Sequence, residues 1–187
     1  RWDVALLQEV PPWWAPRLAR DTGARAARTV LTSRNACLCV RRAVADRRPD
    51  LIKSNGGGAN VILVRGVVPL AHRTQRLRRF PERRWVHAVE LPAGWWVGNL
   101  HAQVRPHTET RKDIAFAAAS LRAWAGDAPH VVLGGDFNVR DPQAAGFARV
   151  PGGRGVDHLL ARGAAGRAEP LRRDGLSDHA PIVASLV

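Results

Sequence analysis

The sequence lacks several features, and each absence excludes a class of protein. Its 187 residues contain no Met, only two Cys and no low-complexity tract. No apolar run approaches the ~18 residues that a membrane-spanning helix needs, so we expect no transmembrane segment. No secretory leader is recognisable either. Because 45% of the residues are hydrophobic and the length suits one domain, we expect a single folded domain over residues 1–187.

The start of the chain and its cysteines bear on its origin. The chain opens at Arg1 rather than at a Met, so we expect an N-terminally incomplete piece of a longer product, with any targeting signal upstream. Cys37 and Cys39 lie two apart in the apolar stretch 30–40. On a strand they would share one face and could not easily bond to each other, so we expect two reduced core thiols. Reduced thiols favour a cytoplasmic location without establishing it.

The charge of the chain is strongly positive. Lys and Arg number 29 against 16 Asp and Glu, which gives a formal net charge of +13. Such a surface attracts polyanions, with DNA or RNA as the first candidates. The alternative is codon usage in a GC-rich genome, because only Lys53 and Lys112 are Lys. If the charge is functional, the Arg-rich segments 76–79 and 83–84 are candidates for a DNA track.

Apolar periodicity and turn residues predict a mixture of strands and helices. Strands are predicted at 4–8, 60–64, 85–91, 95–100, 130–133, 156–160 and 181–186, and one or two strands are predicted within 30–40. A short helix at 13–21 follows Pro11-Pro12 and stops at Gly23. A longer helix is capped by Thr108, carries an apolar stripe through Ile114 and Leu121, and ends at Gly126. Mixed strands and helices with several hairpins predict an α/β domain with mixed sheets.

Polar residues gather at the ends of the predicted strands. They are Gln8-Glu9, His101, Asp136 with Asn138, Asp157-His158, and Ser177-Asp178-His179. Loops at strand ends are where α/β proteins build sites. Carboxylates without Cys suit Mg²⁺ or Mn²⁺ rather than structural zinc.

Several of these segments occur together in a recognisable order. Leu7-Gln8-Glu9, Gly135-Asp136-Phe137-Asn138 and Ser177-Asp178-His179-Ala180-Pro181 resemble signature segments of the endonuclease/exonuclease/phosphatase family. Asn99-Leu100-His101 and Val156-Asp157-His158 resemble two further segments less specifically. The resemblance spans almost the whole chain. It implies a four-layer α/β/β/α sandwich of two mixed sheets flanked by helices, with the site at one edge.

The resemblance also implies roles for individual residues. Glu9 and Asp178 would bind the metal, Mg²⁺ or Mn²⁺; the alternatives are a surface carboxylate and a turn residue. Asp136 would orient or deprotonate the attacking water. Asn138 would hold a phosphate oxygen or a second metal, and the alternative for this pair is an Asx-turn.

Two histidines complete the implied site. His179 would contact the phosphate, with Asp157 hydrogen-bonded to it and raising its pKa. His101 would contact the phosphate too, and the alternative is a structurally satisfied strand-end histidine. An acidic supporter for His101 cannot be placed firmly; Trp85 stands near the expected position and Glu90 is a possible substitute. His158 is interpreted as packing or substrate-edge, and His72, His87, His107 and His130 as structural.

The resulting hypothesis is a monomeric, metal-dependent phosphoesterase leaning towards nonspecific nuclease activity. A phospholipid or inositol-phosphate phosphatase of the same family and a catalytically weak anion-binding member are the alternatives. The calcineurin-like metallophosphatases resemble the chain less, because no Asp-x-His opening is present. Two departures from the family stand out: an opening strand that usually supplies an Asn at the metal is missing, and the stretch 138–157 is short. The paired tryptophans, Trp13-Trp14 and Trp95-Trp96, favour packing over base stacking.

Overall fold

The computed structural model describes residues 2–32, 35, 37–47, 58–175 and 177–187. Its larger sheet has six strands in the order β4-β5-β6-β7-β9-β8. The strands are β4 (Ala71–Arg78), β5 (Arg84–Leu91), β6 (Trp95–His101), β7 (His130–Asp136), β8 (Ala148–Arg149) and β9 (Asp157–Arg162). All neighbouring pairs are antiparallel except β6 and β7, which run parallel.

A smaller antiparallel sheet packs against the larger one. Its strands are β1 (Val4–Val10), β2 (Ala26–Leu31) and β3 (Ala59–Val64), in the order β1-β3-β2. Near the C-terminus β10 (Gly166–Pro170) and β11 (Ile182–Leu186) form a separate antiparallel pair. Two further helical segments are α2 (Leu38–Arg47) and the short η2 (Pro92–Gly94), which joins β5 to β6.

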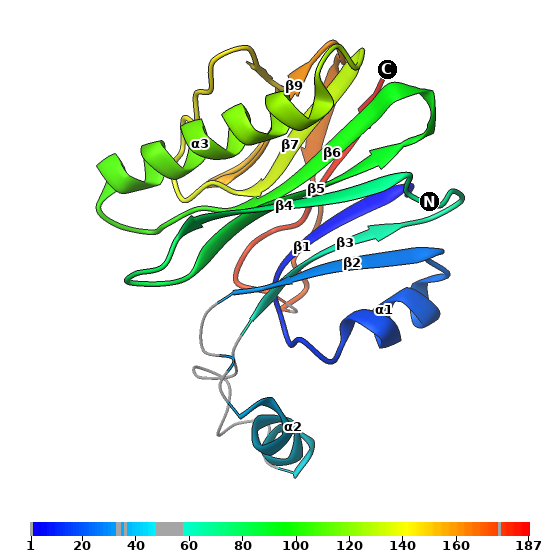
Figure 1. Cartoon of the computed structure of the whole chain (residues 1–187), viewed down its shortest axis with the longest axis vertical. Coiled ribbons are helices and arrows are strands. Elements are labelled where there is room, and N and C mark those ends of the chain that lie inside the picture. The colour runs from blue at the N-terminus through cyan, green and yellow to red at the C-terminus, as the bar shows by residue number, and fades with distance from the viewer. Residues whose placement is uncertain (1, 33–34, 36, 48–57, 176) are drawn as a thin grey trace.

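Helices cover the outer faces of the two sheets, so the molecule has four layers (Figure 1). α3 (His107–Ala125) lies on the larger sheet and α1 (Ala15–Thr22) lies on the smaller one. Three apolar clusters fill the spaces between the layers: Leu100 and Leu133 pack under α3, Ile62 and Val89 lie between the sheets, and Leu63 lies under α1. The predicted α/β/β/α sandwich is confirmed.

α3 exists where it does because β6 and β7 are parallel. A parallel pair needs a crossover connection, and a helix that lies on the sheet is the usual one. Ile114, Ala118 and Leu121 are buried on one side of α3, as the apolar stripe predicted. The predicted cap at Thr108 is wrong: the helix starts at His107, its N-cap is Pro106, and no side chain caps it.

The predicted core position of the two cysteines is wrong as well. β2 ends at Leu31, and Cys39 lies in α2, where a helix replaces the predicted strand. Cys37 and Cys39 are both exposed free thiols, so neither belongs to the core. Alternation of apolar residues over a short stretch does not distinguish a strand from a helix, which explains the error. From the sequence we also expect a turn at Gly56-Gly57-Gly58, and this segment falls mostly outside the described residues.

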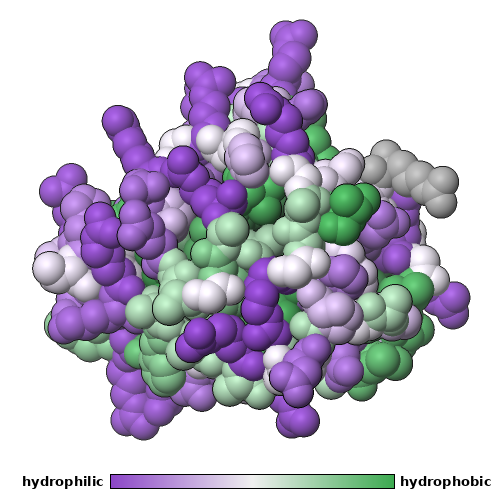
Figure 2. Space-filling model, turned by 90° about the horizontal axis from the view of Figure 1, so that it is seen from above, coloured by the Kyte–Doolittle hydropathy of each residue, from purple (hydrophilic) through white to green (hydrophobic). Residues whose placement is uncertain are grey.

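The exterior is polar and rich in arginine, in keeping with the formal charge of +13. On the face in Figure 2, hydrophilic side chains project around the rim, with paler and apolar surface between them. Among the described residues, no helix combines the length and the apolar character that crossing a membrane requires.

Candidate active site

Three of the predicted site residues form one row across the larger sheet. His101 ends β6 and lies beside Asp136, which ends β7, and Asp136 in turn pairs with Asp157 at the start of β9. Neighbouring strands are ~4.8 Å apart, so register alone brings these side chains together. The Nε2 of His101 lies 3.6 Å from the Oδ2 of Asp136. Strand pairing therefore assembles a site from positions far apart in the chain.

His179 joins this row from the segment that precedes β11. Its Nδ1 lies 2.9 Å from the Oδ2 of Asp157, which is the hydrogen bond that we predicted. Ligand atoms of Asp136, Asp157 and His179 all lie within 4.8 Å of one another. Burial lowers the pKa of His179, but the carboxylates of Asp157 and Asp136 outweigh it, and the pKa is raised from its ordinary value. His179 is thus biased towards the imidazolium form.

Asp136 is buried in the middle of the row. Burial raises its pKa to about 6, and the charge of Asp157 acts in the same direction. The backbone N–H of Asn138 donates to Asp136 Oδ1 at 2.8 Å and partly opposes this shift. This bond forms an Asx-turn, the alternative role for Asp136 and Asn138. Asp136 therefore makes the turn and also lies in the candidate site. The Asn138 amide nitrogen also donates to the carbonyl of Ala102 at 2.9 Å.

His101 is neutral, because burial lowers its pKa to about 3 and the charges of Arg84 and His179 act in the same direction. The suggested supporter Glu90 is wrong. Glu90 pairs with Trp96 near the η2 end of the hairpin, about five residues and ~17 Å of strand away from His101. The neighbour that the sequence did not reveal is Arg84, which is 4% exposed and bonded to Glu82.

The two proposed metal ligands lie at the margins of the row. A register shift between Leu7 and Val10 forms a bulge in β1, where Glu9 is exposed with φ 57°. Bulges commonly re-aim a side chain beside an active site. Asp178 is exposed in the bend before His179 and its charge raises the pKa of Asp157. Neither residue belongs to the cluster of Asp136, Asp157 and His179.

A buried amide network supports β1 beneath Glu9. The Nδ2 of Asn99 donates to the carbonyls of Leu7 and Val61, at 3.0 and 3.1 Å, while its Oδ1 accepts from Gln8 Nε2 at 2.6 Å. Asn99 is fully buried, so it ties the larger sheet to both β1 and β3. Sequence reasoning noted Asn99 only as part of a motif and missed this role.

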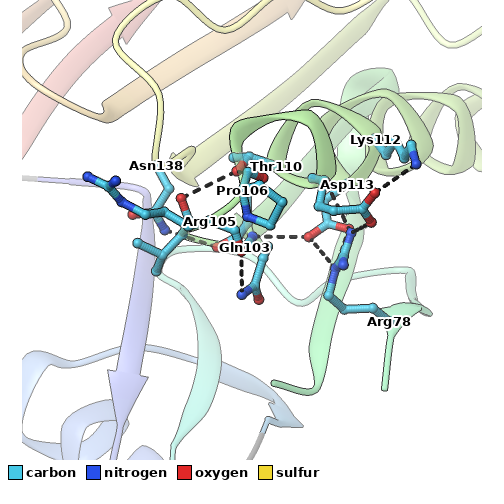
Figure 3. A network of polar contacts seen from close by, with 11 residues as sticks. Arg78, Gln103, Arg105, Pro106, Thr110, Lys112, Asp113 and Asn138 are labelled. Atoms are coloured by element: carbon cyan, nitrogen blue, oxygen red, sulfur yellow. Dashed lines mark hydrogen bonds and ion pairs between the residues drawn. The ribbon is translucent and has the colours of Figure 1, made fainter. Parts of the chain in front are cut away.

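A second network fixes the loop that follows His101 (Figure 3). Asp113 of α3 accepts from the backbone N–H of Gln103 at 3.0 Å and from the Arg78 guanidinium at 2.6 Å. The same Arg78 also bonds Glu109 at 3.1 Å. Arg78 and Arg84 are therefore occupied by carboxylates, which argues against a DNA track built from them.

The remaining histidines and tryptophans mostly pack. His158 lies edge-on to Phe137 at a centroid distance of 6.0 Å. His87 is fully buried and its Nδ1 lies 3.2 Å from His72 Nε2. Trp95 stacks on His130 at 4.4 Å. These contacts fit the packing roles predicted for His72, His87, His130, His158 and Trp95. By contrast, Trp14 is 47% exposed and His107 is exposed.

The donors at this edge fit a hard divalent cation. Carboxylate oxygens dominate, and such ligands suit Mg²⁺ or Mn²⁺. The Nδ1 of His179 is already bonded to Asp157, so the oxygens are the natural ligands. Asn60, opposite the β1 bulge, is fully buried, and neither of its amide atoms finds a hydrogen-bond partner in the described part of the chain. A buried polar group without partners is also compatible with a ligand or water nearby.

Comparisons with known proteins agree with this geometry. The model of the endonuclease/exonuclease/phosphatase family matches residues 1–179. No curated protein matches significantly. Among solved structures, an endonuclease/exonuclease/phosphatase from Bacteroides vulgatus is 15% identical with a TM-score of 0.71, over 99% of this chain and 84% of the other.

Two further structures are similar in fold. A mannosyl-6-phosphatase from Bacteroides thetaiotaomicron is 13% identical with a TM-score of 0.70, over 100% of this chain and 85% of the other. TDP2 from Caenorhabditis elegans is 16% identical with a TM-score of 0.68, over 98% of this chain and 64% of the other. Identities this low demonstrate a shared fold only. The family model, which covers nearly the whole chain, establishes more: the chain belongs to the endonuclease/exonuclease/phosphatase family.

Proposed function

We propose that the chain is a metal-dependent phosphoesterase that hydrolyses a phosphodiester or phosphomonoester at the row of His101, Asp136 and Asp157 with His179. The observation that carries the proposal is the close approach of a carboxyl and an imidazole whose pKa values are both raised. The pKa of Asp136 is raised to about 6, close to neutral pH, while the pKa of the nearby His179 is raised towards a lasting positive charge. Perturbed pKa values that cluster in one place are typical of functional sites, and here they suit a carboxylate base beside a charged imidazolium.

Each side chain takes a definite part in this mechanism. Asp136 orients the attacking water and accepts its proton, for which a pKa near the working pH is suited. His179, held by Asp157 through Nδ1, presents Nε2–H to a phosphoryl oxygen as charge develops there. Asn138 has one amide N–H bonded to Ala102 and offers the other to the phosphate. His101 is neutral, so it contributes a hydrogen bond rather than a charge.

Glu9 and Asp178 are the proposed ligands of Mg²⁺ or Mn²⁺. When bound, such an ion neutralises phosphate charge and stabilises the leaving oxygen. The exposure of both carboxylates at the margin of the row leaves them accessible to a cation. The cluster of Asp136, Asp157 and His179 is the competing ligand set.

The decisive activity test uses two simple substrates, bis(p-nitrophenyl) phosphate and p-nitrophenyl phosphate, with Mg²⁺, Mn²⁺ or EDTA. We expect hydrolysis that needs the metal and falls at least ~100-fold in Asp136→Asn, the usual contribution of a general base. Asp127→Asn, in the exposed loop after α3, is the matched control and should behave as wild type. Turnover that persists in EDTA or in Asp136→Asn would exclude the proposed mechanism.

A binding test separates the two ligand sets without relying on turnover. Mn²⁺ affinity is measured by isothermal titration calorimetry for wild type, Glu9→Gln, Asp178→Asn and His179→Ala. Removing a charged oxygen ligand should weaken affinity about tenfold or more, because ligand charge sets divalent-cation affinity. Loss in Glu9→Gln and Asp178→Asn supports our assignment. Loss in His179→Ala with normal binding by Glu9→Gln would assign the metal to the competing set.

We further propose a substrate class for this phosphoesterase. The positive charge favours a nucleic acid bound without sequence specificity. The similar folds include TDP2 and a mannosyl-6-phosphatase, so both phosphodiesters and phosphomonoesters are candidate substrates. A phospholipid or inositol phosphate is the second candidate, supported by the same anion-attracting surface. DNA binding should weaken steeply as salt rises, whereas hydrolysis of a small phosphoester should not.

A further inference from the structure

An arginine-lined groove continues away from the catalytic residues. A cavity of about 710 Å³ contains Asp157, Asp178 and His179 in its wall. A second cavity of about 420 Å³ adjoins it. The two share Arg140, Arg154 and Gly155. The lining of the second cavity is completed by Arg149, Gly152, Gly153 and His158.

This second cavity is strongly cationic. Its wall includes three arginines and no acidic side chain. Within the described ranges, the guanidinium groups of Arg140 and Arg154 have no ion-pair partner. Arg149 bonds Asp141 at 3.1 Å, in a pair that is about half exposed on the arginine side. Unpaired guanidinium groups in a concave wall are suited to bind phosphate through paired N–H donors.

The loop that carries Arg154 is built against the catalytic strand. The backbone N–H of Asp157 donates to the carbonyl of Arg154 at 3.2 Å, so the turn places Arg154 directly beside the site. The His158 Nε2–H donates to the carbonyl of Gly155 at 3.2 Å. Gly152 has φ 94°, and a Cβ there would collide with the carbonyl oxygen of Ala168. These contacts hold the backbone of the loop, and with it the backbone of Arg154, beside Asp157.

We propose that this groove is a subsite for a second phosphate group of the substrate, next to the phosphate that is hydrolysed, with Arg154 and Arg140 as its main contacts. The inference rests on the proposed phosphoesterase function and narrows its substrate class to molecules with at least two phosphates. The second phosphate is either a neighbouring diester of a nucleic-acid strand or a monoester on a small molecule. Both present the same oxygens to the arginines.

A matched pair of substrates tests the subsite. Thymidine 5′-(p-nitrophenyl phosphate) is compared with the same compound that also carries a 3′-phosphate. In wild type the extra phosphate should lower KM about tenfold, and Arg154→Ala and Arg140→Ala should abolish most of that gain. Arg20→Ala, which removes an exposed arginine on α1, is the control and should keep the gain in full. An equal gain in wild type and Arg154→Ala would overturn the proposal.

A third compound distinguishes the sources of the second phosphate. Its 3′ group is a methyl phosphate diester, which mimics the next linkage of a strand. A gain retained with the diester identifies a nucleic-acid strand, and a gain confined to the monoester identifies a small molecule with two phosphoryl groups. Both results support the subsite and differ only in the source of its ligand.

A binding measurement keeps the subsite testable if turnover fails. Isothermal titration calorimetry compares thymidine 3′,5′-bisphosphate with thymidine 5′-monophosphate on wild type and Arg154→Ala. If wild type binds the bisphosphate more tightly than the monophosphate and Arg154→Ala loses this difference, the subsite is supported. This result would support the subsite even if neither nitrophenyl ester were hydrolysed and the phosphoesterase proposal had failed. Equal affinity of wild type for the two nucleotides would overturn the subsite alone.

Discussion

The Nδ1 of His179 and the Oδ2 of Asp157 lie 2.9 Å apart, although 22 residues separate them in the chain. The contact fixes the proton on Nδ1 and leaves Nε2 as the nitrogen available to a substrate. It also couples the charge of the imidazole to a carboxylate that begins β9. The pair therefore links the electrostatics of the site to the register of the larger sheet.

Replacing Asp157 with Asn should reduce kcat about 100-fold while the fold stays intact. The carboxylate raises the pKa of His179, so its removal lowers that pKa and the imidazolium is lost at a lower pH. The high-pH limb of the kcat profile should then move to lower pH, a shift that a purely structural defect would not produce. Kinetics between pH 5 and 9 and thermal melting are the measurements.

The double variant Asp157→Asn/His179→Ala supplies the control for this prediction. Residues that act as one unit have non-additive effects, so the double variant should be scarcely slower than His179→Ala alone. Additive losses, or an unchanged pH profile in Asp157→Asn, would mean that the two side chains act independently.

Asn99 should matter both for stability and for the proposed metal site. Asn99→Leu removes three hydrogen bonds at once, one of them buried and two part-buried, and should lower the free energy of unfolding by about 3 kcal/mol, at about 1 kcal/mol for each bond. Gln8→Leu removes only one of them and should cost about a third as much. Urea unfolding measures both. Because Asn99 holds the carbonyl of Leu7, two residues before Glu9, Asn99→Leu should also weaken Mn²⁺ binding at the proposed ligand Glu9. If Asn99→Leu were as stable as wild type, the supporting role of Asn99 would be refuted.

The buried imidazole of His87 predicts a loss of stability in acid. Burial lowers its pKa in the folded state to about 3, whereas the unfolded chain takes up the proton near pH 6.5. The unfolded state thus binds more protons between these values. The free energy of unfolding therefore decreases as the pH is lowered through that window, by about 1.4 kcal/mol for each pH unit. At pH 5 the loss from this group is about 2 kcal/mol.

His87→Gln removes this titration and should flatten the dependence. The difference in unfolding free energy between wild type and variant should shrink by about 2 kcal/mol from pH 7 to pH 5. The pKa of Asp136 is raised and the pKa of His101 is lowered, so both groups also make stability depend on pH. Both groups are present in wild type and variant, so their contributions cancel in the comparison. Urea unfolding at the two pH values measures it, and parallel curves would show that His87 is not protonated on unfolding.

Much of the fold follows from local pattern. The apolar runs that predicted β3, β5, β6 and β7 are largely buried in the structure, and the run that predicted β1 is half-buried, because an apolar run of that length must be covered on folding. The signature segments also ordered the site along the chain and predicted the bond between Asp157 and His179. By contrast β4, an edge strand rich in arginine, was not predicted, since none of its residues is buried and its apolar signal is weak.

Tertiary pairing alone decided which of the predicted residues share one site. Local sequence says that His101, Asp136 and Asp157 end or begin strands, but only the parallel β6–β7 and antiparallel β7–β9 registers place them in a row. The burial that raises the pKa of Asp136 and the approach of Arg154 to Asp157 arise in the same way. Pairing register and burial depend on contacts between distant segments, whereas chain composition and periodicity report on neighbours in sequence. The types of the site residues and their positions at strand ends could thus be predicted from the sequence. The pKa shifts that these residues cause in one another depend on the folded sheet.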